Sequence, residues 1–167
     1  MSPVPEIRPL ATRAEAEACA AFLAASEPWR TLGRNELACL QSLEDPAKES
    51  YVAYRDGQLA GCLVLNLLGP FPGYLQIVCA APAFRGSGLG SALVAFAEAR
   101  IFREHPNVFL CVSSFNPRAR RLYERLGYAL VGELPDFLQA GYSEFLYRKS
   151  LGPRDTYQPA PTPPPGA

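Results

Sequence analysis

The chain has 167 residues, of which 49% are apolar and 19% charged, a composition typical of one globular domain with a substantial core. Sixteen basic residues balance sixteen acidic ones without a long run of either sign, so we expect no nucleic-acid partner. No apolar run reaches membrane-spanning length and the N-terminus lacks a signal-peptide core, so we expect no membrane partner and a soluble, cytoplasmic protein.

The predicted elements follow the order of a mixed α/β protein, with helices interleaved among the strands of one sheet. Two strands are joined by Asp56-Gly57, a dipeptide typical of tight β-hairpins. The segments 74–80 and 107–115 are so apolar that we expect them to be buried on both faces. In chain order, we expect a strand over 6–10, helices over 14–26 and from about 35, strands over 50–68 and 74–80, a helix over 88–104, a strand over 107–115, a helix over 116–127, and strands over 128–134 and 141–151.

Capping residues mark the ends of two of these helices. Thr12 and Glu15 have capping-box spacing at the start of the first helix. Pro117 stands at the first position of the last helix, and Gly127 suits the left-handed residue that follows its end. These boundaries support the helical interpretation of both segments.

The C-terminal segment differs in composition from the rest of the chain. It has six prolines in fifteen residues and little apolar surface that could offset the entropy of ordering. We therefore expect one domain over 1–152, followed by a disordered, proline-rich tail over 153–167.

Five cysteines are spread through apolar segments, without a CxxC motif or a cysteine–histidine cluster. Zinc sites need such closely spaced ligands, so we interpret the cysteines as buried free thiols and expect no bound metal. The single histidine, His105, follows a helical pattern, where its charge would favour the negative end of the helix dipole. We interpret it as a surface residue and not as a base.

Three glycines, Gly86, Gly88 and Gly90, follow Arg85 at the start of the helix expected over 88–104. A helix N-terminus presents free backbone N–H groups, and glycine lets the chain adopt positive φ and approach an anion without a Cβ in the way. This glycine turn, residues 85–90, therefore suggests a pyrophosphate site. A plain tight loop, with glycines that serve only packing, would leave the same pattern.

Spacing excludes two familiar phosphate-binding loops. A Walker loop requires a lysine after its last glycine, and none follows Gly90. In a dinucleotide fingerprint the third glycine comes three residues after the second, a position that Ser91 occupies here. The turn therefore belongs to a different kind of anion site.

The pattern Arg-x-x-Gly-x-Gly, with a proline three residues before the arginine, resembles the GNAT superfamily of acetyl-CoA-dependent N-acetyltransferases. A second block, after the next strand, is similar to a further family segment and is matched by Asn116, Ala119, Tyr123, Gly127 and Tyr128. The element order from residue 6 to residue 151 fits as well. The resemblance implies a single α/β domain whose mostly antiparallel, seven-stranded sheet is splayed in the middle, between strands ending at Ala80 and Ser113, and flanked by about four helices.

The resemblance also implies acetyl-CoA as the acyl donor. Pantetheine would lie between the splayed strands like an extra strand, and a backbone N–H near Ala80 would stabilise the oxyanion that forms on attack. The pyrophosphate would bind the amides of the glycine turn. The implied cofactor-binding residues are Val78, Cys79, Ala80, Arg85, Gly86, Ser87, Gly88, Leu89, Gly90, Ser91, Asn116, Ala119 and Tyr123.

Tyr123 matches the tyrosine that often serves as general acid in the family. A phenol with an unperturbed pKa of about 10 is protonated at neutral pH and can donate to the departing sulfur. The alternative is an aromatic ring that packs between helix and sheet with its hydroxyl merely hydrogen-bonded.

The identity of the general base stays open, because Tyr74 stands about where some family members have a glutamate. The alternatives are a water chain, or Glu36, Asp136 or Glu144, each of which we interpret as a surface or strand-edge carboxylate.

Family analogy places the acceptor beside two loops, residues 27–33 and 135–144. The candidate substrate residues are Trp29, Tyr74, Gln76, Phe137 and Tyr142.

We expect acetyl transfer to a primary amine of a small molecule, amino acid or peptide, by direct attack in a ternary complex. The alternatives are a non-catalytic CoA-binding sensor, and an acyltransferase that uses a longer acyl chain or a hydroxyl acceptor. The resemblance leaves a homodimer open.

Overall fold

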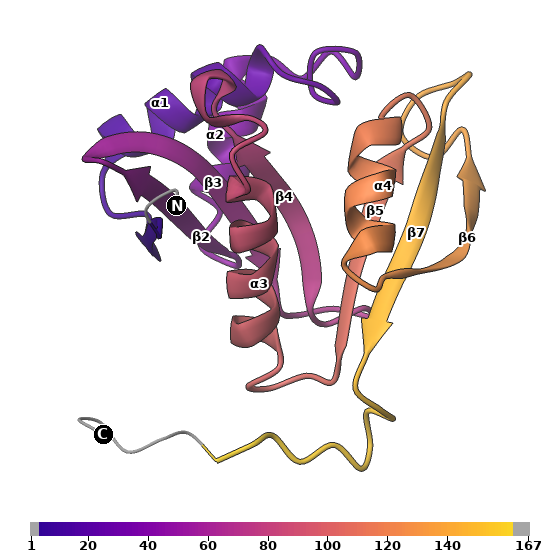
Figure 1. The fold of residues 1–167 in the computed structure, drawn as a ribbon. Coiled ribbons are helices and arrows are strands. Elements are labelled where there is room, and N and C mark those ends of the chain that lie inside the picture. The colour runs from indigo at the N-terminus through magenta and orange to yellow at the C-terminus, as the bar shows by residue number, and fades with distance from the viewer. Residues whose placement is uncertain (1–3, 162–167) are drawn as a thin grey trace.

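A computed structural model of the chain describes residues 4–161, and within them seven strands form one sheet in the order β1-β2-β3-β4-β5-β7-β6 (Figure 1). The strands are β1 (Glu6–Pro9), β2 (Glu49–Arg55), β3 (Gln58–Asn66), β4 (Tyr74–Ala80), β5 (Asn107–Ser113), β6 (Ala129–Pro135) and β7 (Ser143–Ser150). The helices are α1 (Arg13–Ala24), α2 (Glu36–Leu43), the short 3-10 helix η1 (Pro82–Phe84), α3 (Leu89–Ile101) and α4 (Pro117–Arg125). Every strand pair except β4–β5 is antiparallel, which confirms the expected mixed α/β class.

The local signals in the sequence reappear as caps and turns. The capping box forms, because Thr12 and Glu15 each accept a bond from the other residue's backbone N–H. Asn35 caps α2 and Gly127 follows α4 with a φ of +90°, as expected. The long helix is shorter than predicted, since α3 begins after a left-handed Gly88 and ends at Ile101 in a turn.

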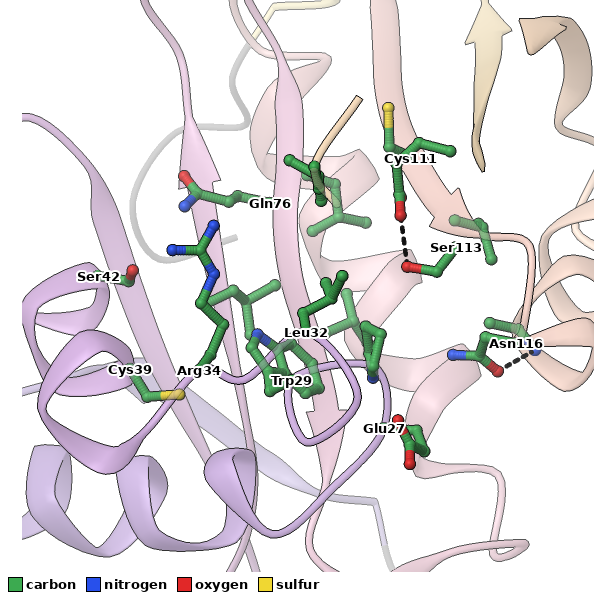
Figure 2. A pocket seen from close by; sticks show the side chains of 18 of the residues that line it. Glu27, Trp29, Leu32, Arg34, Cys39, Ser42, Gln76, Cys111, Ser113 and Asn116 are labelled. Atoms are coloured by element: carbon green, nitrogen blue, oxygen red, sulfur yellow. Dashed lines mark hydrogen bonds between the residues drawn. The ribbon is translucent and has the colours of Figure 1, made fainter. Parts of the chain in front are cut away.

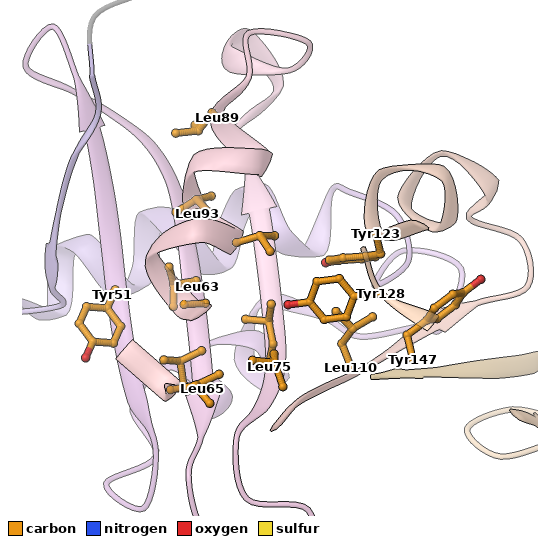
Figure 3. Close-up of a cluster of buried hydrophobic side chains, with 14 of the residues drawn as sticks. Tyr51, Leu63, Leu65, Leu75, Leu89, Leu93, Leu110, Tyr123, Tyr128 and Tyr147 are labelled. Carbon is orange, nitrogen blue, oxygen red and sulfur yellow. The ribbon is translucent and has the colours of Figure 1, made fainter. Parts of the chain in front are cut away.

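The two faces of the sheet carry separate cores. The helices α1 and α2 cover one face, and α3 and α4 cover the other (Figure 1). Figure 3 shows the core beneath α3 and α4, which we call the α3-side core and which includes Leu63, Leu65, Leu75, Leu89, Leu93, Leu110, Tyr123 and Tyr147. The other, the α1-side core, includes Cys19, Leu23, Leu40, Val64, Ile77 and Cys79. The strand residues of the α1-side core come from β2, β3 and β4, so α1 and α2 cover that half of their face of the sheet.

The strands β4 and β5 meet at one end and diverge at the other, as expected (Figure 1). Their single registered pair is Tyr74 with Phe109, and the Phe109 N–H donates to the Gly73 carbonyl at 3.0 Å. Gly73 has a φ of +90°, and a Cβ there would lie 2.4 Å from the Asn107 carbonyl oxygen. The junction therefore depends on a residue without a side chain, and beyond it the sheet has a gap.

The expectation that β4 and β5 are buried on both faces is wrong. Along β4 the buried residues Leu75, Ile77 and Cys79 alternate with half-buried ones, and β5 alternates in the same way over most of its length. A bulge places Gln76 opposite no residue of β3, so Leu75 joins the α3-side core whereas Ile77 joins the α1-side core. Apolar side chains here border a cavity where a neighbouring strand would otherwise lie.

All five cysteines are free thiols, as expected. Cys19, Cys39, Cys62 and Cys79 are buried together in the α1-side core, and Cys111 is half-buried. Within residues 4–161, no three or more histidine, cysteine or acidic side chains are grouped so that they could hold a metal ion. The same residues include no helix of the length and apolar character needed to cross a membrane.

The described part of the tail makes one hydrogen bond to the domain, while residues 162–167 lie outside the described residues. Tyr157 donates a hydrogen bond from its hydroxyl to the Phe102 carbonyl at 2.5 Å. Such a bond contributes about 1 kcal/mol, so deleting the chain after Gly152 should lower the melting temperature by only about 2–4 °C. Calorimetry of the truncated protein checks this, and a loss several times larger would make the tail part of the fold.

Candidate active site

A cavity of about 440 Å³ opens where β4 and β5 diverge (Figure 2). Its walls come from the loop before α2, from α2, β4, β5 and α4, and from the segment between β6 and β7. Of the residues proposed from the sequence, it brings together Trp29, Tyr74, Gln76, Val78, Asn116, Ala119, Tyr123 and Phe137. Tyr142 does not line it, because its ring packs edge-on against Phe115 with 4.8 Å between ring centroids.

The glycine turn has the left-handed backbone that the sequence suggests at two of its three glycines. Gly86 has a φ of +74° and Gly88 a φ of +81°. Gly90 instead lies inside α3, where a Cβ would touch Leu122 at an ordinary 3.6 Å. The first helical bond of α3 runs from the Ala92 N–H to the Gly88 carbonyl, so the amides of residues 89–91 have no partner within the helix. The turn therefore presents free N–H groups at the positive end of a helix.

The other residues of the turn differ in what they can contribute. The Leu89 side chain is buried in the α3-side core, so only its backbone can meet a ligand. Ser91 is half-buried in the first turn of α3. The Ser87 hydroxyl donates to the Phe84 carbonyl at 2.6 Å, which ties the turn to η1.

Two arginines place positive charge beside the turn. Arg85 does not extend over the glycines but donates to the Ser26 hydroxyl and, at 3.5 Å, to the Ala80 carbonyl. The Arg118 guanidinium lies 3.8 Å from where a Gly86 Cβ would stand. Arg85 therefore links the turn to the end of α1, and Arg118 places a second positive charge beside Gly86.

A third arginine, which the sequence analysis does not single out, contacts the turn through a hydrogen bond from the end of β2. Arg55, at the end of β2, is only 8% exposed and donates to the Ser87 hydroxyl at 2.6 Å. Its Nε has no hydrogen-bond partner among the described residues. The signal in the sequence was a charged residue at an inward-facing position of an alternating strand.

The edge of β4 that faces the gap has no neighbouring strand beyond Tyr74. Val78, Cys79 and Ala80 pair with β3 on their other side. The Val78 side chain lines the cavity, whereas Cys79 lies in the α1-side core, where burial raises the pKa of its thiol to about 11. Val78 can thus contact a ligand in the gap, whereas the Cys79 carbonyl oxygen faces β3 and lies 2.6 Å from where a Gly61 Cβ would stand. The sequence-based expectation that Cys79 contacts the cofactor therefore has no support in this geometry.

Tyr123 reaches the cavity from α4. It is 9% exposed, and its ring packs edge-on against Tyr128 with 5.6 Å between centroids. Burial, and secondarily the neighbouring Cys79, raise the pKa of its phenol, so it stays protonated at neutral pH. Its hydroxyl makes no hydrogen bond to any described residue, which leaves the proton free for a ligand in the cavity.

Asn116 caps α4 and also lines the cavity. Its side-chain oxygen accepts a bond from the Ala119 N–H at 3.2 Å, drawn as a dashed line in Figure 2. The cap is compatible with the implied contact to the cofactor, because capping occupies the oxygen and leaves the amide N–H groups for a ligand.

Glu144 is not the surface or strand-edge carboxylate that the sequence suggests. It is 4% exposed, lies on β7 between β5 and β6, and lines the cavity. The Ser113 hydroxyl donates to it at 2.6 Å, and burial raises the pKa of its carboxyl. Glu36 and Asp136 are exposed, as expected. The only signal was an acid within an alternating strand, since the pairing of β5 with β7 has no local signature.

Comparison with known proteins agrees with this geometry. Residues 11–128 match the acetyltransferase (GNAT) family. A blasticidin-S acetyltransferase of Streptomyces morookaense is 33% identical over 102 residues, which are 61% of this chain and 74% of that protein.

Solved structures share the fold. An aminoglycoside 6'-N-acetyltransferase complexed with coenzyme A superposes with a TM-score of 0.70 at 15% identity, over 89% of this chain and 98% of that one. A spermidine/spermine N-acetyltransferase from Vibrio cholerae gives a TM-score of 0.67 at 19% identity, over 87% and 92% of the two chains. Because the family match spans most of the sheet and both sequence blocks, the chain belongs to the acetyltransferase (GNAT) family and is an acyltransferase.

Proposed function

We propose that this protein transfers an acetyl group from acetyl-CoA to a primary amine of a small molecule, amino acid or peptide, by direct attack in a ternary complex. The observation that carries the proposal is that β4, whose outer edge is free, and Tyr123, whose hydroxyl has no protein partner, line one cavity. The glycine turn does not line this cavity but follows the end of β4 through η1. The GNAT family uses acetyl-CoA, and one structural neighbour is a coenzyme A complex.

The residues around the gap fit the chemical parts of coenzyme A. A pyrophosphate suits the free amides of residues 89–91 and the left-handed Gly86 and Gly88, with Arg118 nearby. A pantetheine chain carries amide groups, which suit the backbone of Val78 on the β4 edge that has no neighbouring strand. Charge and hydrogen-bond type thus agree at both ends of the cofactor.

The chain's own residues would act on the acetyl group in two ways. A backbone N–H of the β4 edge stabilises negative charge on the thioester oxygen as the amine attacks. Tyr123 donates its phenolic proton to the departing sulfur, because a thiol with a pKa of about 8.5 is released mainly in its protonated form at neutral pH. Both groups border the same gap, on opposite sides of it.

The remaining walls of the cavity suit an organic amine. Trp29 and Phe137 are apolar, and Gln76 and Arg34 add polar groups (Figure 2). Arg34 makes no ion pair within residues 4–161, so an anionic group of the acceptor could bind it. The relative and the structural neighbours are named for blasticidin S, aminoglycosides and spermidine or spermine, which supports testing small-molecule amines first.

The test is thiol release from acetyl-CoA with a panel of polyamines, aminoglycosides, nucleoside amines, amino acids and peptides. We expect one thiol released for each amine acetylated, with the product identified by mass spectrometry. Binding of coenzyme A without release for any amine would favour the sensor alternative. Faster release from a longer thioester, or acetylation of a hydroxyl, would favour the other alternative.

The cofactor site itself predicts the effect of Gly88→Val. We expect affinity for coenzyme A to fall about tenfold or more, because a β-branched side chain disfavours a φ of +81° and would protrude into the space of the phosphates. Gly57→Val is the matched control, since Gly57 has a φ of +73° in the β2–β3 turn. Calorimetric titration should show weaker binding only for Gly88→Val; equal affinity in both variants would remove the phosphate site from the turn.

A further inference from the structure

Glu144 and Ser113 form a buried pair on the wall of the cavity. They face each other across β7 and the end of β5, and are 4% and 2% exposed. The Ser113 hydroxyl donates to Glu144 Oε1 at 2.6 Å, the dashed line at Ser113 in Figure 2. Glu144 Oε2 has no hydrogen bond within residues 4–161, so it is free for a donor in the cavity.

No cation of the described residues balances the charge of Glu144. Other carboxylates that are buried or half-buried have such partners: Glu15 has Arg8, Glu49 has Arg100 and Glu98 has Lys149. The bond from Arg8 holds the pKa of the Glu15 carboxyl at about 2, whereas burial moves that of Glu144 upward. An uncompensated buried carboxylate is costly, and a cationic ligand would relieve that cost.

The titratable neighbours of Glu144 supply no positive charge. They are Tyr74 from β4 and Cys111 from β5, and burial raises the pKa of both, so each is neutral at neutral pH. With Ser113 they make a polar patch in the cavity wall. The other charged residues of the wall are Glu27, which pairs with Arg30, and Arg34 from the loop before α2; neither forms an ion pair with Glu144. The patch therefore has one chargeable group, whose raised pKa brings it closer to the value that suits a general base.

We propose that Glu144 binds the ammonium group of the acceptor and removes one proton from it, with Ser113 as the positioning residue. This inference rests on the proposed function, which assigns a proton donor but no proton acceptor, and it supplies that acceptor. It also selects acceptors that are protonated at neutral pH.

The protons balance in the complete reaction. The ammonium gives one proton to Glu144, and the resulting amine attacks the thioester carbonyl, so that a C–N bond forms and the C–S bond breaks. The sulfur takes the Tyr123 proton, and the second surplus proton of the nitrogen restores the phenol. Glu144 then releases its proton to solvent through the open cavity. The sum is ammonium plus thioester giving amide, thiol and one proton.

The experiment compares the pH dependence of kcat/KM for the parent protein and Glu144→Gln, with the best amine of the panel. The base is active above its pKa, so parental kcat/KM should fall as the pH drops through the raised pKa of Glu144. In Glu144→Gln we expect a loss of about 10²–10⁴-fold at neutral pH, recovered as the pH approaches the pKa of the amine itself. Glu36→Gln, an exposed carboxylate outside the cavity, should match the parent.

A second acceptor separates proton removal from mere packing. A weakly basic amine of similar size, such as an arylamine or a hydrazide, is largely unprotonated at neutral pH and should lose far less in Glu144→Gln. Glu144→Asp should still show the fall of kcat/KM at low pH. Ser113→Ala should show this fall at a shifted pH, with a smaller loss of kcat/KM at neutral pH than Glu144→Gln. Thermal melts and coenzyme A titration verify that each variant is folded.

The outcomes distinguish this inference from the proposed function. If the parent acetylates no amine, both are overturned. If the parent acetylates amines and Glu144→Gln shows the same rate at every pH, only the role of Glu144 is overturned. An equal loss for the strongly and the weakly basic acceptor would also overturn it, because a structural role would not distinguish the two. If Glu144→Gln fails to fold, the fall of kcat/KM at low pH is compared in Glu144→Asp and Ser113→Ala instead. A fall that stays at the parental pH in Ser113→Ala would overturn the role of Glu144.

Discussion

Tyr123→Phe is expected to lower kcat by about 10²–10⁴-fold while coenzyme A affinity stays unchanged. The ring and its edge-on contact with Tyr128 survive in the variant, and only the hydroxyl without a protein partner is lost. Steady-state kinetics with a good acceptor, under conditions where chemistry limits the rate, measures the effect. A water molecule could partly take over proton donation in the variant, so we expect a loss of kcat near the lower end of this range.

The leaving group provides a check on this role. The penalty in Tyr123→Phe should shrink with a thioester whose thiol is more acidic, because that thiolate needs less protonation. Tyr128→Phe is the matched control, since Tyr128 packs against Tyr123 but does not line the cavity. A Tyr123→Phe protein as fast as the Tyr128→Phe protein would reduce Tyr123 to a packing residue.

Gly73→Ala is expected to destabilise the fold by about 3 kcal/mol or more. The substitution meets two obstacles at once, a φ of +90° and a Cβ position 2.4 Å from the Asn107 carbonyl oxygen. For a domain of this size the loss corresponds to roughly 6–12 °C in melting temperature. Because Gly73 joins β4 to β5, we also expect weaker coenzyme A binding in the variant.

Gly69→Ala separates strain from collision. Gly69 also has a φ of +90°, but a Cβ there would meet nothing within 4 Å. The melting temperature of Gly69→Ala should therefore fall less than that of Gly73→Ala, because only the strain of an alanine at positive φ contributes. Equal losses in the two variants would mean that the close approach of Gly73 to Asn107 contributes nothing to the junction.

The parts of this protein that could be predicted from the sequence are those that depend on neighbouring residues. The capping box at Thr12, the Asp56-Gly57 hairpin and the left-handed Gly86 and Gly88 all follow from local backbone geometry, and all are present. The order of strands in the middle of the sheet followed from the family resemblance, because local patterns carry no information on it.

What could not be predicted depends on residues that are far apart in the sequence. Glu144 becomes buried only because β7 pairs with β5 and not solely with its sequence neighbour β6. The apolar pattern of β4 indicates burial but cannot show that a cavity takes the place of one neighbour. Arg85 belongs to a recognisable motif, yet its side chain bonds to Ser26 at the end of α1, a contact between distant segments.

The gap between β4 and β5 also changes what a sheet edge means in this protein. An exterior edge with unpaired N–H and C=O groups invites another chain to add a strand, and proteins guard against such aggregation with charges, prolines or bulges. Here the edges of β4 and β5 beyond their single registered pair face each other within one sheet, so neither is an outer edge of the sheet. The backbone groups that would make an outer strand adhesive are turned toward the interior of the gap.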